Sequence, residues 1–375
     1  MDERLERTRR ALRSLGCDWG VFTNFDSIAY ALGHVPTIEN GLSPFAGGPT
    51  VAFVGADGAC GLAAPNVEAA AAAASRAEAT VLYEGFAYEH AVDLTANYRA
   101  AVAQLVERLG VGGALAVEPE SFSVQLADAI GGRSVVDVTP ALRRVRAVKT
   151  EAEKSLMRRS AGAAAAGQNA FYLSAGEGRT ELDVFADIRR AMENFAGERI
   201  SVAGDFLSGK KRTAGVAGWP TDRVIALGEP LMSDLAPRVS GYWGDSCASA
   251  VLGEPSEAYL RMFRAAKTAL DRALEIMRPG LVAREVDAEL RRCVGASGYA
   301  YPHHSGHSIG GSVHEWPRLT PYEEAPLESG MFMMVEPAAY DPDVGGVRLE
   351  WMIEITENGC SPAAPFDHRP EIAGG

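Results

Sequence analysis

The stretch LMSDLAPRVSGYWGDSC, residues 231–247, decides how this chain arranges its acidic side chains. If it folds as a β-hairpin about the Val239–Ser240 midpoint, Asp234 and Asp245 lie directly opposite each other on one side of the ribbon. The Cβ atoms of such a pair are about 4.5–5.5 Å apart, and two like charges at that distance destabilise the ribbon. The pattern therefore predicts a cation beside the two carboxylates. The alternative is that these two and the two glutamates of the second ribbon are all surface acids on exposed ribbons.

A second ribbon, residues 331–356, repeats this arrangement with glutamates. A turn centred on Asp343 places Glu336 opposite Glu350. A buried carboxylate without a partner is costly, so this ribbon also predicts a nearby cation. The neighbouring residues are apolar and predict buried strands: Phe332, Val335, Val347, Leu349 and Ile353.

A glycine-rich stretch, YPHHSGHSIGGSVHE (residues 301–315), holds four of the seven histidines: His303, His304, His307 and His314. This concentration favours a shared function over four separate structural roles. The glycines argue against a helix here. Glu315 is followed by Trp316-Pro317, which excludes the His-Glu-x-x-His helix of the zincins.

Four carboxylates and one imidazole form a hard, oxygen-rich set of ligands. Four negative charges balance two divalent ions, which predicts a dinuclear centre with the ions about 3.5–4 Å apart. Such ligands favour Mn²⁺, Fe²⁺, Co²⁺ or Zn²⁺.

The composition is that of a globular protein with two domains. The chain has 375 residues, of which 47% are hydrophobic and 23% charged. The formal net charge of −13 argues against binding to nucleic acid. Apolar runs are far shorter than the about 20 residues that cross a bilayer. The charged start of the chain and five widely spaced cysteines fit a cytoplasmic protein with reduced thiols.

Strands and helices alternate in the first 145 residues, which predicts a small α/β domain. The expected strands are 19–23, 48–53 and 114–117, and the expected helices are 4–15, 65–78, 88–108 and 121–130. Residues 138–150 are interpreted as a solvated connector. The expected later helices are 151–173, one from Thr180 with a Thr180/Asp183 capping box, 256–278 and 283–297.

Two motifs suggest other chemistry. Gly204 to Lys210 is similar to a phosphate-binding loop, but Lys211 stands where the Mg²⁺-binding Ser/Thr is needed. Gly306-His-Ser308-Ile-Gly310 matches the nucleophile elbow of serine hydrolases, which needs a strand before Ser308 and a helix after it. The Gly-Gly and Trp-Pro pairs that follow do not favour that helix, so a serine hydrolase using Ser308 is kept only as an alternative.

The order of these residues resembles the pita-bread metallohydrolases, the family of methionine aminopeptidase, aminopeptidase P, prolidase and creatinase. The family pattern is Asp, a second Asp eleven residues later, Gly-His, Glu-Pro and Arg-x-Glu. This chain fills it with Asp234, Asp245, Gly306-His307, Glu336-Pro337 and Arg348-Leu349-Glu350. The resemblance implies an α/β (α+β) protein with a creatinase-like N-terminal domain over 1–145. The catalytic domain, over 146–375, is then a pita-bread fold with a curved antiparallel sheet.

The resemblance also implies a mechanism and partners. It implies a hydrolase of amide-type C–N bonds with two divalent ions, Mn²⁺ foremost and Co²⁺, Zn²⁺ or Fe²⁺ as alternatives. It further implies a homodimer acting on a small peptide or a small-molecule amide. The implied ligands are Asp234, Asp245, His307, Glu336 and Glu350. Glu336 is also the implied proton shuttle, His314 stabilises the oxyanion or protonates the leaving nitrogen, and His303 and Arg348 line the substrate site.

The chain departs from the family pattern around this centre. Proline-specific relatives carry a histidine about 17 residues before the first ligand, where this chain has Trp219, which we take as a candidate substrate-binding residue. Ala248 and Trp351 replace a usual Arg and Asp, and Ala338 replaces the Gly of Glu-Pro-Gly. Altered residues around a preserved set of metal ligands are expected if this chain acts on a different substrate from its relatives.

We therefore expect an enzyme most like an Xaa-Pro aminopeptidase or dipeptidase. A small-molecule amide or amidine hydrolase, like creatinase or ectoine hydrolase, is the nearest alternative, and a lyase on the same fold is another. A non-catalytic binding module is a third.

Overall fold

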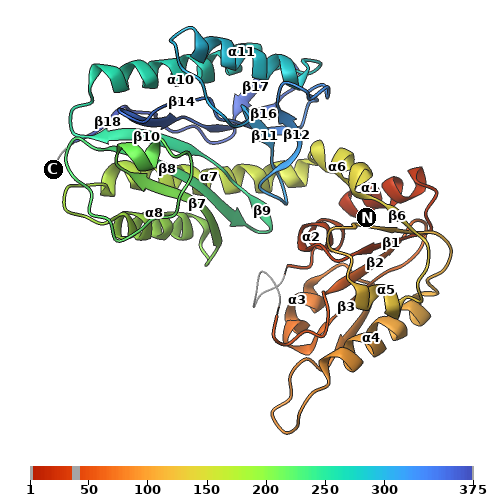
Figure 1. Cartoon of the computed structure of the whole chain (residues 1–375). Coiled ribbons are helices and arrows are strands. Elements are labelled where there is room, and N and C mark those ends of the chain that lie inside the picture. Colours follow the sequence, from red (N-terminus) through yellow and green to blue (C-terminus); the bar gives the residue numbers. More distant parts are fainter. Residues whose placement is uncertain (1–2, 36–42, 374–375) are drawn as a thin grey trace. The chain divides into compact units, whose positions relative to one another are not determined.

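The computed structural model describes residues 3–35 and 43–373. The chain divides into two compact units, Met1–Arg146 and Ala147–Gly375, and each is described by itself (Figure 1). Among the described residues, no helix is both long and apolar enough to cross a membrane.

The first unit contains six strands and six α-helices within its described residues. The strands are β1 (Trp19–Phe22), β2 (Val51–Gly55), β3 (Cys60–Pro65), β4 (Ala79–Tyr83), β5 (Leu115–Val117) and β6 (Val135–Asp137). The helices are α1 (Glu3–Ser14), α2 (Phe25–Leu32), α3 (Ala69–Ala74), α4 (Leu94–Leu109), α5 (Val124–Ala129) and α6 (Thr139–Ala147), with a 3₁₀ turn at Asn66–Glu68.

These elements form a mixed sheet covered by helices on both faces. The strand order is β4-β3-β2-β1-β5-β6, with β1–β2 and β2–β3 antiparallel and the other pairs parallel. Alternate residues of one strand face opposite sides: Phe53 packs with α4 and α5, whereas Val54 packs with α1, α2 and α6. The predicted α/β class of this unit is confirmed.

Two predictions for this unit are wrong in detail. The expected helix over 65–78 is only a short helical segment, because strand β3 runs to Pro65 and α3 ends at Ala74. Residues 139–147 of the expected connector are helix α6, which buries Leu142 in the core of the unit.

The second unit carries two further sheets and a ribbon. Its helices are α7 (Glu151–Ser174), α8 (Glu181–Ala196), α9 (Lys210–Thr213), α10 (Glu257–Ile276) and α11 (Ala283–Gly295). The strands of its first half are β7 (Ser201–Ser208), β8 (Pro230–Val239), β9 (Tyr242–Trp243) and β10 (Cys247–Leu252). Those of its second half are β11 (Gly306–Ser308), β12 (Glu315–Leu319), β13 (Phe332–Val335), β14 (Ala338–Asp341), β15 (Gly345–Arg348), β16 (Trp351–Ile355), β17 (Cys360–Pro362) and β18 (Glu371–Ile372). The predicted capping box of Thr180 and Asp183 is present at the start of α8.

Each sheet of this unit is covered by its own pair of helices (Figure 1). Helices α7 and α8 pack on the sheet β18-β10-β8-β7, and α10 and α11 pack on β12-β11-β13-β16-β17 together with the β14–β15 ribbon. The strands pair antiparallel apart from β10 with β18. Cys247 and Glu350 form a β-bridge between the two layers, in which the Glu350 N–H donates to the Cys247 carbonyl at 2.9 Å.

The register of the first predicted hairpin is wrong by two residues. Asp234 lies opposite Cys247, because the two-residue turn is Ser240-Gly241 rather than one centred between Val239 and Ser240. Both turn residues have positive φ, 51° and 86°, as a type I′ turn requires. Side chains alternate with a period of two, so a shift of two residues leaves both aspartates on the same side of the ribbon.

The register of the second hairpin is confirmed. The pairs Ala338–Arg348 and Val335–Trp351 lie on either side of Glu336 and Glu350 and share the predicted register. The apolar neighbours of the two glutamates are fully buried, as predicted.

Gly204 allows strand β7 to lie against Asp234, which yields a prediction. Its φ is +127°, and a Cβ atom there would lie 2.1 Å from the Asp234 carbonyl oxygen. We expect Gly204→Ala to lower the free energy of unfolding by about 3 kcal/mol, since it adds both backbone strain and a clash. Urea unfolding measures this. The control is Gly178→Ala, at φ +80° with no atom within 4 Å, which should cost only about 1 kcal/mol. Equal costs would contradict the clash.

Candidate metal centre

The predicted ligands gather where the strands of the second unit are interrupted. Asp245 lies between β9 and β10, Glu336 between β13 and β14, and Glu350 between β15 and β16. His307 lies in the middle of β11. One ligand atom each of Asp245, His307 and Glu350 lies within 4.8 Å of the others. All three of these side chains are buried, so the cluster is an internal site.

Asp234 belongs to the same acidic cluster but is paired with an arginine. Its Oδ2 accepts a hydrogen bond from Nη2 of Arg348, whose side chain is buried. Burial raises the pKa of Asp234 to about 6, although the Arg348 charge opposes the shift. Nη1 of Arg348 also donates to the carbonyl of Val216 at 3.3 Å, so this side chain links the cluster to the loop that precedes β8.

The buried carboxylates favour a cation. Burial raises the pKa of Asp245 well above its ordinary value, and the charges of Asp234 and Glu336 add to the shift. Glu350 shows the same effect, from burial and then from Asp245. Carboxylates with raised pKa values that face one another destabilise the ionised site unless positive charge is added. The donor set therefore fits two divalent ions, as the sequence predicted.

His307 presents a neutral ring nitrogen to the carboxylates. Its Nδ1 lies 3.0 Å from the Ser308 carbonyl oxygen, which can accept a hydrogen bond only from the Nδ1–H tautomer. Nε2 is then unprotonated, 3.8 Å from both Asp245 Oδ2 and Glu336 Oε1. Burial lowers the pKa of His307 to about 3, so the imidazole stays in the form that binds metals.

Glu336 is surrounded by histidines. His304 Nε2 lies 2.9 Å from Oε1, and His303 Nδ1 lies 3.6 Å from Oε2. Burial opposes the ionisation of Glu336. The His304 hydrogen bond and the charge of Arg348 outweigh burial, and the pKa of Glu336 falls to about 2. This carboxylate is therefore ionised across the neutral pH range.

The other predicted site residues fall into two groups. His303 and His314 lie beside the cluster: the His314 ring is 4.2 Å from that of His307, and His303 Nε2 is 3.0 Å from the Tyr340 hydroxyl. Burial lowers the pKa of both histidines. Trp219 stands on the loop before β8 with 82% of its surface exposed, and its carbonyl accepts from Arg212. Among the predicted residues, Trp219 is the one whose side chain is not gathered at the cluster in the described structure.

His304 is a site residue that the sequence analysis did not assign. Its nitrogen lies within 4.8 Å of ligand atoms of both His307 and His314. The sequence feature that could have pointed to His304 is its place in the same histidine-rich stretch as His307. Sequence alone does not tell which of two adjacent histidines faces the carboxylates, because the stretch is not a regular helix or strand.

Two of the departures from the family pattern, Ala248 and Trp351, pack against other side chains of the second unit. Trp351 packs against His368, with ring centroids 5.0 Å apart, and Lys267 Nζ lies 5.7 Å from its ring centre. Ala248 is buried in the core beneath α7 and α8. Both replacements therefore pack against apolar or aromatic neighbours.

The structure excludes both alternative motifs. Ser308 is fully buried within β11, between β12 and β13, whereas a nucleophile elbow exposes its serine on a turn before a helix. The serine-hydrolase alternative is therefore wrong. Gly204 to Ser208 are part of strand β7, so this segment forms no phosphate-binding loop.

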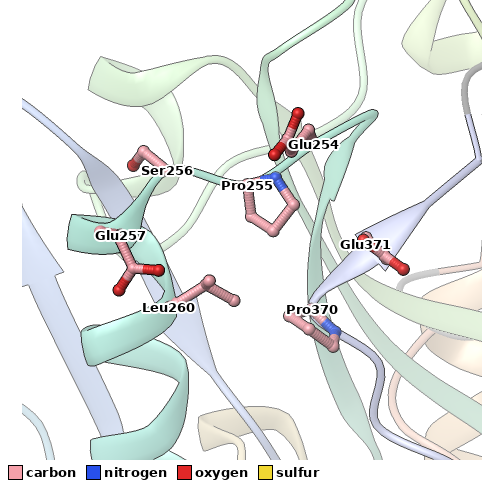
Figure 2. A pocket seen from close by; sticks show the side chains of 7 residues that line it. All are labelled: Glu254, Pro255, Ser256, Glu257, Leu260, Pro370 and Glu371. Atoms are coloured by element: carbon pink, nitrogen blue, oxygen red, sulfur yellow. The ribbon is translucent and has the colours of Figure 1, made fainter.

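A pocket of about 610 Å³ lies elsewhere in the same unit, at the start of α10 (Figure 2). Three carboxylates line it, those of Glu254, Glu257 and Glu371. It contains none of the predicted site residues and no histidine.

Comparison with known proteins places these observations in a family. The model of metallopeptidase family M24 matches residues 155–357, and that of the creatinase/prolidase N-terminal domain matches residues 4–148. The Xaa-Pro dipeptidase of Pyrococcus horikoshii is 30% identical over 256 residues, covering 68% of this chain and 72% of the relative.

Solved structures share the fold over nearly the whole chain. Dipeptidase PepE from Mycobacterium ulcerans matches with a TM-score of 0.81 and 26% identity, covering 99% of this chain and 97% of that one. The prolidase from Pyrococcus horikoshii matches with a TM-score of 0.82 and 23% identity, covering 98% and 99%, which supports the fold.

Removing the metal should destabilise this protein, increasingly so at higher pH. The raised pKa values of Asp245 and Glu350 mean that the metal-free fold is stable with these groups protonated and loses stability as pH rises through those values. At metal concentrations about 100-fold above Kd, we expect chelation to lower Tm by about 5–10 °C at pH 8, and by less at pH 5. Scanning calorimetry at both pH values, with metal content checked, measures this. An unchanged Tm after confirmed metal removal would contradict the buried-carboxylate site.

Proposed function

The chain belongs to metallopeptidase family M24 and is a metallohydrolase, and on this premise we propose that it is an Xaa-Pro dipeptidase. The substrate would be a dipeptide with proline at its carboxyl end. The observation that carries the proposal is the buried cluster of Asp245, His307 and Glu350, whose ligand atoms lie within 4.8 Å of one another. The names of the relatives, Xaa-Pro dipeptidase among them, support the substrate class.

Five side chains would hold the two divalent ions: Asp234, Asp245, His307, Glu336 and Glu350. When bound, such ions supply a water with a pKa near neutrality and polarise a scissile carbonyl. We propose Mn²⁺ as the native ion, because four of the five ligands are carboxylates. The His307 tautomer set by the Ser308 carbonyl fixes which ring nitrogen is available for this role.

Glu336 and His314 would move protons during the reaction. Glu336 is ionised and in contact with His304, so it can accept a proton from the attacking water and return it to the leaving nitrogen. His314 is exposed at the edge of the cluster, where it can donate a hydrogen bond to the developing oxyanion. His303, held by Tyr340, and Arg348, held by Asp234, would line the space for the substrate.

The loop before β8 favours a second candidate, a hydrolase of small-molecule amides. Its Ala217-Gly218-Trp219 segment has no histidine, and the Trp219 indole is exposed. An indole offers an apolar surface and one N–H donor instead of a titratable imidazole. A substrate that binds at this loop would be recognised by apolar contact with the Trp219 indole rather than by a hydrogen bond or charge interaction with an imidazole.

Two further features remain proposals. We infer a homodimer from the family. We infer a cytoplasmic location from the five cysteines, none of which forms a disulfide. Light scattering coupled to size-exclusion chromatography measures the oligomeric state.

The metal content of the Asp245→Ala variant tests the centre directly. Because Asp245 lies in the cluster with His307 and Glu350, we expect about two ions per chain in the wild type and at most one in the variant. Elemental mass spectrometry after reconstitution and desalting gives the count. The control is Asp271→Ala, which removes a partly exposed carboxylate on α10 that pairs with Lys267. A variant that keeps both ions would contradict the assignment.

Activity on a panel of Xaa-Pro dipeptides, Xaa-Pro tripeptides and small-molecule amides tests the substrate. We expect cleavage of the dipeptides and a fall in kcat of about 10²–10⁴-fold for Glu336→Gln. The control is His90→Gln, which changes an exposed histidine of the first unit. Metal-loaded protein that cleaves none of the proline peptides would contradict the dipeptidase proposal, and turnover of the amides would support the second candidate.

A further inference from the structure

His304 and His303 are adjacent, but only one of them has a nitrogen available to the cluster. Both ring nitrogens of His303 are engaged, Nδ1 with the His304 carbonyl at 2.8 Å and Nε2 with the Tyr340 hydroxyl at 3.0 Å. His304 instead directs Nε2 at Oε1 of Glu336, 2.9 Å away. Its side chain is 19% exposed, so it lies at the inner edge of the site.

The spacing of these two atoms suits two ligands of one ion. Bonds of about 2.0–2.2 Å from one ion to a nitrogen and an oxygen place these two atoms about 3 Å apart at a right angle and about 3.4 Å apart at a tetrahedral angle. His304 Nε2 and Glu336 Oε1 have this separation. The same Oε1 lies 3.8 Å from Nε2 of His307, the nitrogen that faces the carboxylates. His304 and His307 therefore both present Nε2 to the same carboxylate oxygen of Glu336.

We propose that His304 is an additional ligand of the centre, so that the ion next to His307 is bound by two imidazoles rather than one. This inference rests on the proposed dinuclear site and extends it. Within the described residues, His307 belongs to two possible metal-binding groups, one with Asp245 and Glu350 and one with His304 and His314. His307 therefore has carboxylates on one side and imidazoles on the other.

The consequence is a difference in metal preference between the two ends of the centre. Imidazole ligands suit Zn²⁺, Fe²⁺ and Ni²⁺, whereas carboxylates suit Mn²⁺. The end near Asp234 has an arginine, Arg348, as its nearest cation and offers oxygen ligands. At the end with His304 and His307, the second imidazole adds a nitrogen ligand. This end should therefore prefer Co²⁺ or Zn²⁺ over Mn²⁺ more strongly than a site with one imidazole does.

Counting the nitrogens bound to the first ion tests the proposal. The full chain is loaded with one equivalent of Co²⁺, the ion that the imidazole-rich end should prefer, and pulsed electron paramagnetic resonance detects the directly coupled ¹⁴N nuclei. We expect two imidazole nitrogens in the wild type and one in His304→Gln. The glutamine keeps an N–H donor for Glu336, so a role limited to that hydrogen bond would survive the change. The matched control is His303→Gln, which should keep both nitrogens.

A second readout is affinity. Competition titration should show that His304→Gln weakens Co²⁺ binding by about tenfold or more while affecting Mn²⁺ less, so the ratio of the two affinities falls. A single coupled nitrogen in the wild type, or an unchanged ratio in the variant, would overturn the proposal and leave the dinuclear site intact. A wild type that binds no divalent ion would overturn this proposal and the proposed function together.

Discussion

The repulsion among buried carboxylates is the constraint on which the second unit depends. Asp245 and Glu350 are buried close together, and burial raises the pKa of each. Arg348 contributes one compensating charge, and it is committed to Asp234. The remaining negative charge has no comparable partner among the described side chains of the cluster. The fold thus creates a site whose stable ionised form contains added cations, and the same ions are the ones that hydrolysis requires.

The two layers of the unit hold this charge in place from opposite sides. The hairpin of β8 and β10 is fixed by the core beneath α7 and α8, and the strands that carry His307 and Glu336 are fixed by the core beneath α10 and α11. The bridge of Cys247 with Glu350 joins the layers directly at the site. The ligands therefore cannot separate to relieve their repulsion without breaking both cores, which is why cation binding and stability are linked.

The centre and its surroundings differ in how closely they follow the family. Every ligand position is filled, and the changes concern residues that pack against other side chains of the second unit, such as Ala248 and Trp351, or stand on the loop that carries Trp219. His304 would change the centre itself, because it places an imidazole nitrogen 2.9 Å from Glu336 in addition to the predicted ligand His307. Substrate choice and metal preference can thus vary in this chain while the ligand geometry is kept.

The sequence by itself determined the residue types and the order of the predicted ligands, and the register of the hairpin that runs from β13 to β16. The turn centred on Asp343 can be recognised from the local sequence, so Glu336 could be placed opposite Glu350 from sequence alone. The first hairpin could not be placed, because its register depends on positive φ at Ser240 and Gly241. Only the tertiary structure decided that His304 brings Nε2 to 2.9 Å from Glu336 while His303 Nδ1 binds the His304 carbonyl, and that Arg348 pairs with Asp234. The contacts of Glu336 and Asp234 join residues from separate strands and loops, and their distances are set by how the two layers pack.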